Sequence, residues 1–124
     1  MGMNVLIVDD SAVMRKILER ALRQAHVDID QVVGAGDGAE ALERLKTGGF
    51  HVIFSDVNMP NMDGLELLKQ IKQSGDYKEV PVVMVTTEGT ESKVMEALSL
   101  GAAGYIKKPF TPIQMQEALQ RVVS

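Results

Sequence analysis

The chain has 124 residues, of which 45% are hydrophobic and 24% charged, and this composition is typical of one folded domain. Its 17 acidic and 13 basic residues leave a net charge of −4, so charge gives no reason to expect nucleic-acid binding. The absence of cysteine excludes disulfides and thiolate metal sites. No apolar run approaches the roughly 20 residues that span a membrane, and no signal peptide is evident. We therefore expect a single cytoplasmic domain over residues 1–124, with no output domain and no membrane contact.

Five short apolar segments of strand length alternate with five segments of helical periodicity. The predicted strands cover residues 5–8, 32–35, 52–55, 82–85 and 104–107. A helix is predicted after each strand, because apolar residues recur there three or four positions apart. In the first helix these residues are Val13, Met14, Ile17, Leu18, Ala21, Leu22 and Ala25, and in the fourth they are Val94, Ala97 and Leu98.

Capping residues mark where two of the helices begin. Asp37 is the predicted N-cap of the second helix, and Glu40 follows three residues later in the pattern of a capping box. In the last helix Thr111 is the predicted N-cap, Pro112 occupies the first helical position and Gln114 completes a capping box. These signals agree with the helical periodicity that follows each of them.

The five βα units predict an α/β fold with one doubly wound parallel sheet. Strands that are apolar throughout, rather than alternating, indicate a sheet covered by helices on both faces. Right-handed crossovers then place the C-terminal ends of all strands at one edge, where open α/β sheets bind ligands. Polar residues follow the predicted strands at this edge: Asp9 and Asp10, Asp56, Thr86, and Lys108.

The chemistry predicted for this edge starts from its three carboxylates. Asp9, Asp10 and Asp56 would repel one another without a cation, and oxygen ligands without nearby His or Cys favour Mg²⁺. Acidic pairs also occur as solvated loop caps, but an acid that ends a separate buried strand favours the metal site. A carboxylate can attack phosphorus to form an acyl phosphate. Lys108 and the Thr86 hydroxyl would then stabilise the phosphoryl oxygens.

These residues stand in motifs that resemble the receiver domain of two-component response regulators, and in particular stand-alone chemotaxis regulators of the CheY type. The motifs are VDDS at 8–11, DVNMPNMDG at 56–64, VT at 85–86 and GYIKKPFT at 104–111. The resemblance runs from about residue 4 to residue 123. It implies a (βα)5 sheet of five parallel strands in the flavodoxin-like order 2-1-3-4-5.

The resemblance also implies a role for each matching residue in phosphoryl transfer. Asp56 would accept a phosphoryl group from a phosphohistidine of a sensor histidine kinase. Asp10, Asp56 and the backbone carbonyl of Asn58 would bind Mg²⁺, with Asp9 helping directly or through water. Thr86 would bind the phosphoryl group, as would Lys108.

The resemblance also implies features at further positions that control the signal. Asn58 and Glu88 match positions that tune the lifetime of the phosphoryl group. The Lys108–Pro109 peptide bond is expected to be cis. Tyr105, taken alone a half-buried strand aromatic, would turn inward together with Thr86. That movement would change the surface formed by the fourth helix, the fifth strand and the fifth helix.

The expected partners are a sensor histidine kinase, a downstream target protein and a phosphatase. The resemblance favours a flagellar switch protein as the target, and a receiver serving a non-chemotaxis phosphorelay is the alternative. We expect a monomer that is not an enzyme beyond catalysing its own phosphorylation and dephosphorylation.

Two other functional classes fit the sequence less well. An Mg²⁺-dependent phosphohydrolase of the haloacid dehalogenase type needs a second acid two residues after its nucleophile, and Asn58 stands there. A nucleotide-binding flavodoxin-like protein needs a glycine-rich phosphate loop after the first strand. Asp9-Asp10-Ser11 stands in that place.

Overall fold

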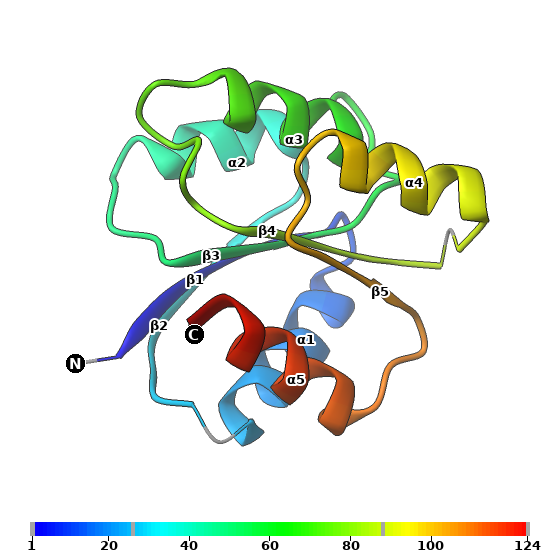
Figure 1. Ribbon diagram of the computed structural model, residues 1–124. Coiled ribbons are helices and arrows are strands. Elements are labelled where there is room, and N and C mark those ends of the chain that lie inside the picture. Colours follow the sequence, from blue (N-terminus) through cyan, green and yellow to red (C-terminus); the bar gives the residue numbers. More distant parts are fainter. Residues whose placement is uncertain (1, 26, 88, 124) are drawn as a thin grey trace.

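The computed structural model describes residues 2–25, 27–87 and 89–123, and within them five strands alternate with five helices (Figure 1). The strands are β1 (Met3–Val8), β2 (Ile29–Ala35), β3 (Val52–Ser55), β4 (Val82–Thr86) and β5 (Gly104–Lys107). The helices are α1 (Ala12–Gln24), α2 (Gly38–Leu45), α3 (Gly64–Gln73), α4 (Glu91–Ser99) and α5 (Pro112–Val123).

The five strands form one parallel sheet in the order β2-β1-β3-β4-β5, which confirms the predicted topology. Helices α1 and α5 cover one face, and α2, α3 and α4 cover the other (Figure 1). Each face has its own hydrophobic core, and alternate residues of the central strands enter the two cores. In β3, for example, Phe54 packs under α1 and α5, and Ile53 packs on the opposite side.

The edge strand β2 is longer than its apolar residues predict. It begins at Ile29 instead of residue 32, because Asp30 and Gln31 extend the strand although both are exposed. Polar residues are tolerated in an edge strand that is only partly covered, so hydrophobicity alone does not reveal where such a strand begins. Within the described residues, no helix is both long and apolar enough to cross a membrane.

The predicted apolar face of α1 is too wide. Met14 and Leu18 pack into the core, but the side chains of Val13 and Ile17 are 69% and 47% exposed. These two residues each precede a core residue by one position and are therefore rotated roughly 100° around the helix from it. Leu98 of α4 is likewise exposed, whereas its neighbour Ala97 is buried. A helix lying on a sheet buries a narrower stripe than its hydrophobic residues suggest.

The capping predictions hold for α5 and need one change for α2. The Gln114 backbone N–H donates to Thr111 Oγ1 (3.2 Å) and the Thr111 N–H donates to Gln114 Oε1 (2.8 Å), which is a complete capping box. Asp37 caps α2 as predicted, because its Oδ1 accepts from the Glu40 N–H at 2.8 Å. The Glu40 carboxylate, however, accepts from the N–H of Gly36, one residue before the N-cap.

Gly64, the first residue of α3, closes the loop that follows β3. Its N–H donates to the carbonyl of Val57 at 2.8 Å, and a Cβ at this position would overlap the backbone oxygen of Asp56. The helix can therefore begin directly behind the end of β3 only if this residue lacks a side chain.

We expect Gly64→Ala to lower the free energy of unfolding by about 1–3 kcal/mol, the usual cost of forcing extra atoms into a packed site. Urea unfolding measures this change. Gly75→Ala is the matched control, because a Cβ there would have no atom within 4 Å and should leave stability unchanged or slightly raised. Equal effects of the two substitutions would show that the close approach of Gly64 to Asp56 is not required.

Candidate functional site

Three carboxylates converge at the C-terminal edge of the sheet. Asp9 and Asp10 follow β1, and Asp56 follows β3, which pairs directly with β1 through Val8 and Ser55. The Asp56 N–H also donates to the Val8 carbonyl at 2.9 Å, which extends the pairing past the end of β3. As a result, one carboxylate oxygen from each of the three aspartates lies within 4.8 Å of the others.

Backbone hydrogen bonds orient two of these side chains. The Ser11 N–H donates to Asp9 Oδ1 at 2.9 Å, and the Val57 N–H donates to Asp56 Oδ1 at 2.7 Å. The Asp9 side chain is only 2% exposed and that of Asp56 is 12% exposed, whereas Asp10 lies at the surface. The cluster thus runs from a buried carboxylate to one that solvent reaches freely.

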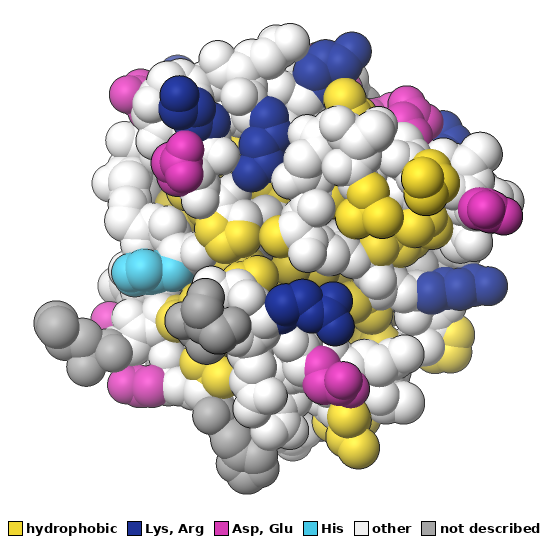
Figure 2. All heavy atoms as spheres, in the orientation of Figure 1, with side chains coloured by type: hydrophobic (Ala, Val, Ile, Leu, Met, Phe, Trp, Pro, Cys, Tyr) yellow, Lys and Arg dark blue, Asp and Glu magenta, His cyan; other side chains and the backbone are white. Residues whose placement is uncertain are grey.

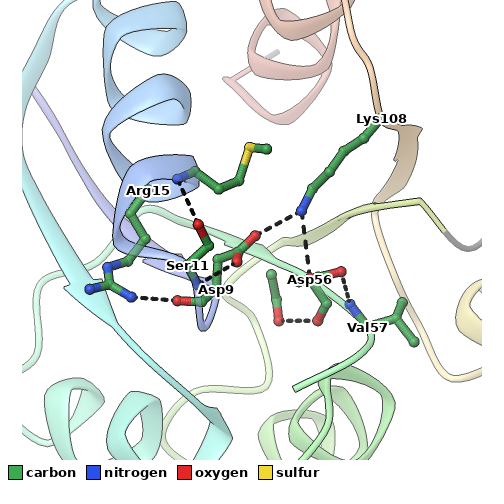
Figure 3. Close-up of polar contacts among 8 residues, drawn as sticks. Asp9, Ser11, Arg15, Asp56, Val57 and Lys108 are labelled. Carbon is green, nitrogen blue, oxygen red and sulfur yellow. Dashed lines mark hydrogen bonds and ion pairs between the residues drawn. The ribbon is translucent and has the colours of Figure 1, made fainter. Parts of the chain in front are cut away.

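Lys108 supplies the positive charge next to the cluster (Figure 3). It follows β5, and its Nζ lies 2.8 Å from Asp9 Oδ2 and 3.5 Å from Asp56 Oδ2. The Lys108 N–H donates to the Thr86 carbonyl at 2.8 Å, which continues the β4–β5 pairing and places the side chain over the edge. Its peptide bond to Pro109 is cis, as the resemblance implied. One ammonium group cannot balance three carboxylates, so a divalent cation fits the remaining oxygen atoms.

The remaining predicted site residues differ in how far they are buried. Thr86 ends β4 and is fully buried, whereas Thr87 is exposed. Tyr105 is half-buried on β5, where it packs against the core beneath α4. Asn58 is exposed in the loop after Asp56. Glu88 lies outside the described residues.

Sequence reasoning missed Arg15, which holds the loop after β1. Its Nη1 donates to the backbone carbonyl of Asp9 at 2.5 Å (Figure 3). Its side chain also passes over Gly34 of β2, 3.1 Å from where a Cβ would stand. The guanidinium group therefore fixes the backbone of the acidic loop. An arginine on a helix is usually solvated, so the sequence carries no signal for this contact.

A second missed contact joins two loops beside the cluster. The side-chain amide of Asn61, in the loop after β3, donates to Asp37 Oδ2 at 2.8 Å. Asn61 has a φ of 65°, a left-handed conformation that asparagine tolerates better than most residues. The Pro60-Asn61 pair does predict a turn, but nothing in the sequence identifies a partner 24 residues away.

Comparison with known proteins identifies the class of this fold and site. The model of the response regulator receiver domain matches residues 5–120, and the chain belongs to this family. Members of the family act as signalling switches rather than as conventional enzymes. The site residues at the sheet edge all lie within the matched range.

Individual relatives place the chain among receivers of the CheY type. The chemotaxis protein CheY1 of Helicobacter pylori is 40% identical over 122 residues, which cover 98% of this chain and 97% of that protein. The structure of chemotaxis protein CheY4 of Vibrio cholerae is 40% identical, with a TM-score of 0.87, over 98% of this chain and 99% of that one. The CheX–CheY–BeF3–Mg²⁺ complex from Borrelia burgdorferi matches at 30% identity with a TM-score of 0.89, over 98% and 90% of the two chains.

The contacts of Asp37 predict a specific pH dependence of stability. The Glu40 N–H and then the Asn61 amide donate hydrogen bonds that hold the pKa of the Asp37 carboxyl below its ordinary value of 3.8. A depressed pKa stabilises the folded state above the ordinary value, and this contribution disappears as the pH falls through the folded-state pKa. Asp37→Asn should therefore lower the urea midpoint at neutral pH, and its deficit relative to wild type should shrink below pH 3.8. A deficit that does not change with pH would contradict this assignment.

Proposed function

We propose that this chain is a phosphorylation-activated switch, acting as a single receiver domain over residues 1–124, and that Asp56 accepts the phosphoryl group. The observation that carries this proposal is the placement of Asp56. One of its oxygens is held by the Val57 N–H, and the other faces Lys108 at 3.5 Å at the sheet edge. In the transfer, an Asp56 oxygen bonds to phosphorus while the bond from phosphorus to the histidine nitrogen of a sensor kinase breaks. The histidine leaves as the neutral imidazole after protonation, and Asp56 becomes an acyl phosphate.

Mg²⁺ is the cofactor that this proposal requires. Asp10, Asp56 and the backbone carbonyl of Asn58 would hold it, with Asp9 contributing directly or through water. The donors are oxygen atoms only, which suits a hard divalent cation, and the three carboxylates lie close enough to share one. When bound, the ion would neutralise charge on the phosphoryl oxygens as they approach the acidic cluster. The Borrelia burgdorferi relative, whose structure contains Mg²⁺ and BeF3, supports this choice of ion.

Lys108 and Thr86 would bind the phosphoryl group from the side of β4 and β5. Lys108 Nζ already contacts Asp56 and needs only a small movement to reach an oxygen attached to it. Phosphorylation would thus draw Lys108 away from Asp9, whose buried carboxylate would rely on the metal instead. Asn58 and Glu88 would set how quickly water removes the phosphoryl group.

The output surface in this proposal is formed by α4, β5 and α5. Thr86 ends β4 beside β5, where Thr86 pairs with Lys107 and Met84 with Tyr105. A shift of Thr86 toward the phosphoryl group would therefore change the surroundings of Tyr105 on the neighbouring strand. Figure 2 shows hydrophobic side chains gathered where Figure 1 places α4, and Met95 and Leu98 of that helix are 59% and 46% exposed. Such exposed apolar groups suit a protein-binding surface.

The similarity to chemotaxis proteins favours a partner that controls the flagellar motor, such as a flagellar switch protein, together with a phosphatase that ends the signal. A stand-alone receiver in a non-chemotaxis phosphorelay would use the same chemistry and the same surface with another target.

Labelling with a small phosphodonor tests the acceptor. Incubated with acetyl phosphate and Mg²⁺, the wild-type protein should gain the mass of one phosphoryl group, and Asp56→Asn should gain none because an amide oxygen does not form the acyl phosphate. Asp76→Asn, an exposed carboxylate beyond α3, is the matched control and should be labelled normally. Addition of EDTA should suppress labelling of the wild type. Persistent labelling of Asp56→Asn would exclude Asp56 as the acceptor.

A further inference from the structure

The loop between β3 and α3 is bound to the loop between β2 and α2. Asp37 uses its two carboxylate oxygens for different tasks, because Oδ1 accepts from the Glu40 N–H and caps α2, while Oδ2 accepts from the Asn61 side chain at 2.8 Å. The first contact serves the helix. The second contact joins Asp37 to Asn61 in the loop that follows Asp56.

A second pair of contacts reinforces this link. The Gly38 N–H donates to the carbonyl of Met62 at 3.1 Å. A Cβ on Gly38 would lie 2.7–2.9 Å from side-chain atoms of Met62, so the start of α2 fits closely against the loop. Asp37 and Gly38, the N-cap and the first residue of α2, therefore both bind the loop from the N-terminus of this helix.

The loop is short. Within it the Met62 N–H donates to the Pro60 carbonyl at 2.7 Å, and the side chains of Met59 and Met62 pack against the core. It leaves the sheet at Asp56 and is closed by the hydrogen bond from Gly64 to Val57. Between these ends lie the exposed Asn58 and the left-handed Asn61. The segment that carries Asn58 is thus anchored at its base by Gly64 and at its outer part by Asp37 and Gly38.

We propose that the Asp37–Asn61 hydrogen bond positions the backbone carbonyl of Asn58 for Mg²⁺, so that α2 is part of the support of the metal site. This inference rests on the proposed function, since it takes the Asn58 carbonyl as a metal ligand. Asp37 and Asn61 act as positioning residues and do not touch the ion.

The size of the effect follows from how often the loop is correctly placed. If the binding-competent loop is populated in only a fraction of the molecules, the apparent dissociation constant rises by the inverse of that fraction. An exposed hydrogen bond makes only a modest contribution to the population of one loop conformation, so its loss should lower the competent fraction to between roughly a half and a tenth of its wild-type value. The expected change is therefore an increase of about two- to ten-fold in the Kd for Mg²⁺.

Two substitutions remove the link from opposite sides. Asn61→Gly deletes the amide and still permits a positive φ. Asp37→Ser keeps a side-chain oxygen that can cap α2 but lacks a second oxygen for Asn61. Because the second variant leaves the loop sequence unchanged, it separates loss of the hydrogen bond from the greater freedom that glycine itself introduces.

The test is isothermal titration calorimetry of Mg²⁺ into the metal-free protein, with urea unfolding of each variant without Mg²⁺. Each single variant should bind Mg²⁺ about two- to ten-fold more weakly than wild type, and the double variant should be no weaker than the weaker single one. The exchanged pair, Asp37→Asn with Asn61→Asp, keeps the capping oxygen and reverses donor and acceptor. It should recover most of the affinity.

The outcomes separate this inference from the proposed function. Variants that unfold at lower urea but bind Mg²⁺ as tightly as wild type would show that the pair is merely structural, and would overturn the inference alone. Independent, additive losses in the double variant would also overturn it. A wild-type protein that does not bind Mg²⁺ would overturn the proposed function as well.

Discussion

Repulsion among three carboxylates at one edge of the sheet is the constraint on which the rest of the site depends. Parallel pairing of β1 with β3 places Asp9 beside Asp56 at the C-terminal edge of the sheet. Lys108 relieves part of the repulsion through its 2.8 Å ion pair with the buried Asp9. The balance is incomplete, so the site favours a divalent cation. The same balance explains how a phosphoryl group could act as a signal, because a new negative charge on Asp56 competes with Asp9 for Lys108.

Backbone groups maintain this crowded arrangement. The Ser11 N–H holds one oxygen of Asp9, and the Val57 N–H holds one oxygen of Asp56. The Arg15 guanidinium binds the backbone carbonyl of Asp9. Gly64 allows α3 to begin close behind Asp56, with no side chain between them. These contacts therefore orient the carboxylates that the loops carry.

The sequence predicts the central part of the fold better than its edges. β1, β3 and β4 each contain an apolar run that is followed by polar residues, so the C-terminal ends of these strands could be inferred. Together with the end of β5, they also predict the convergence of Asp9, Asp56 and Lys108. The start of β2 could not, because an edge strand tolerates Asp30 and Gln31. Contacts such as Asn61 with Asp37 join residues far apart in the chain, and no local pattern encodes them. The exposure of Val13 and Ile17 was missed because periodicity gives the direction of a helix face but not its width.

We propose Asp56 as the phosphoacceptor in a site completed by Mg²⁺. The most direct measurement is a crystal structure of the protein with Mg²⁺ and beryllofluoride, which mimics an acyl phosphate. We expect beryllium bonded to an oxygen of Asp56, a metal ion in contact with Asp10 and the carbonyl of Asn58, and Lys108 Nζ turned from Asp9 to a fluorine atom. Beryllofluoride on another carboxylate, or on Asp56 with Lys108 still paired to Asp9 and no metal at the acidic cluster, would contradict it.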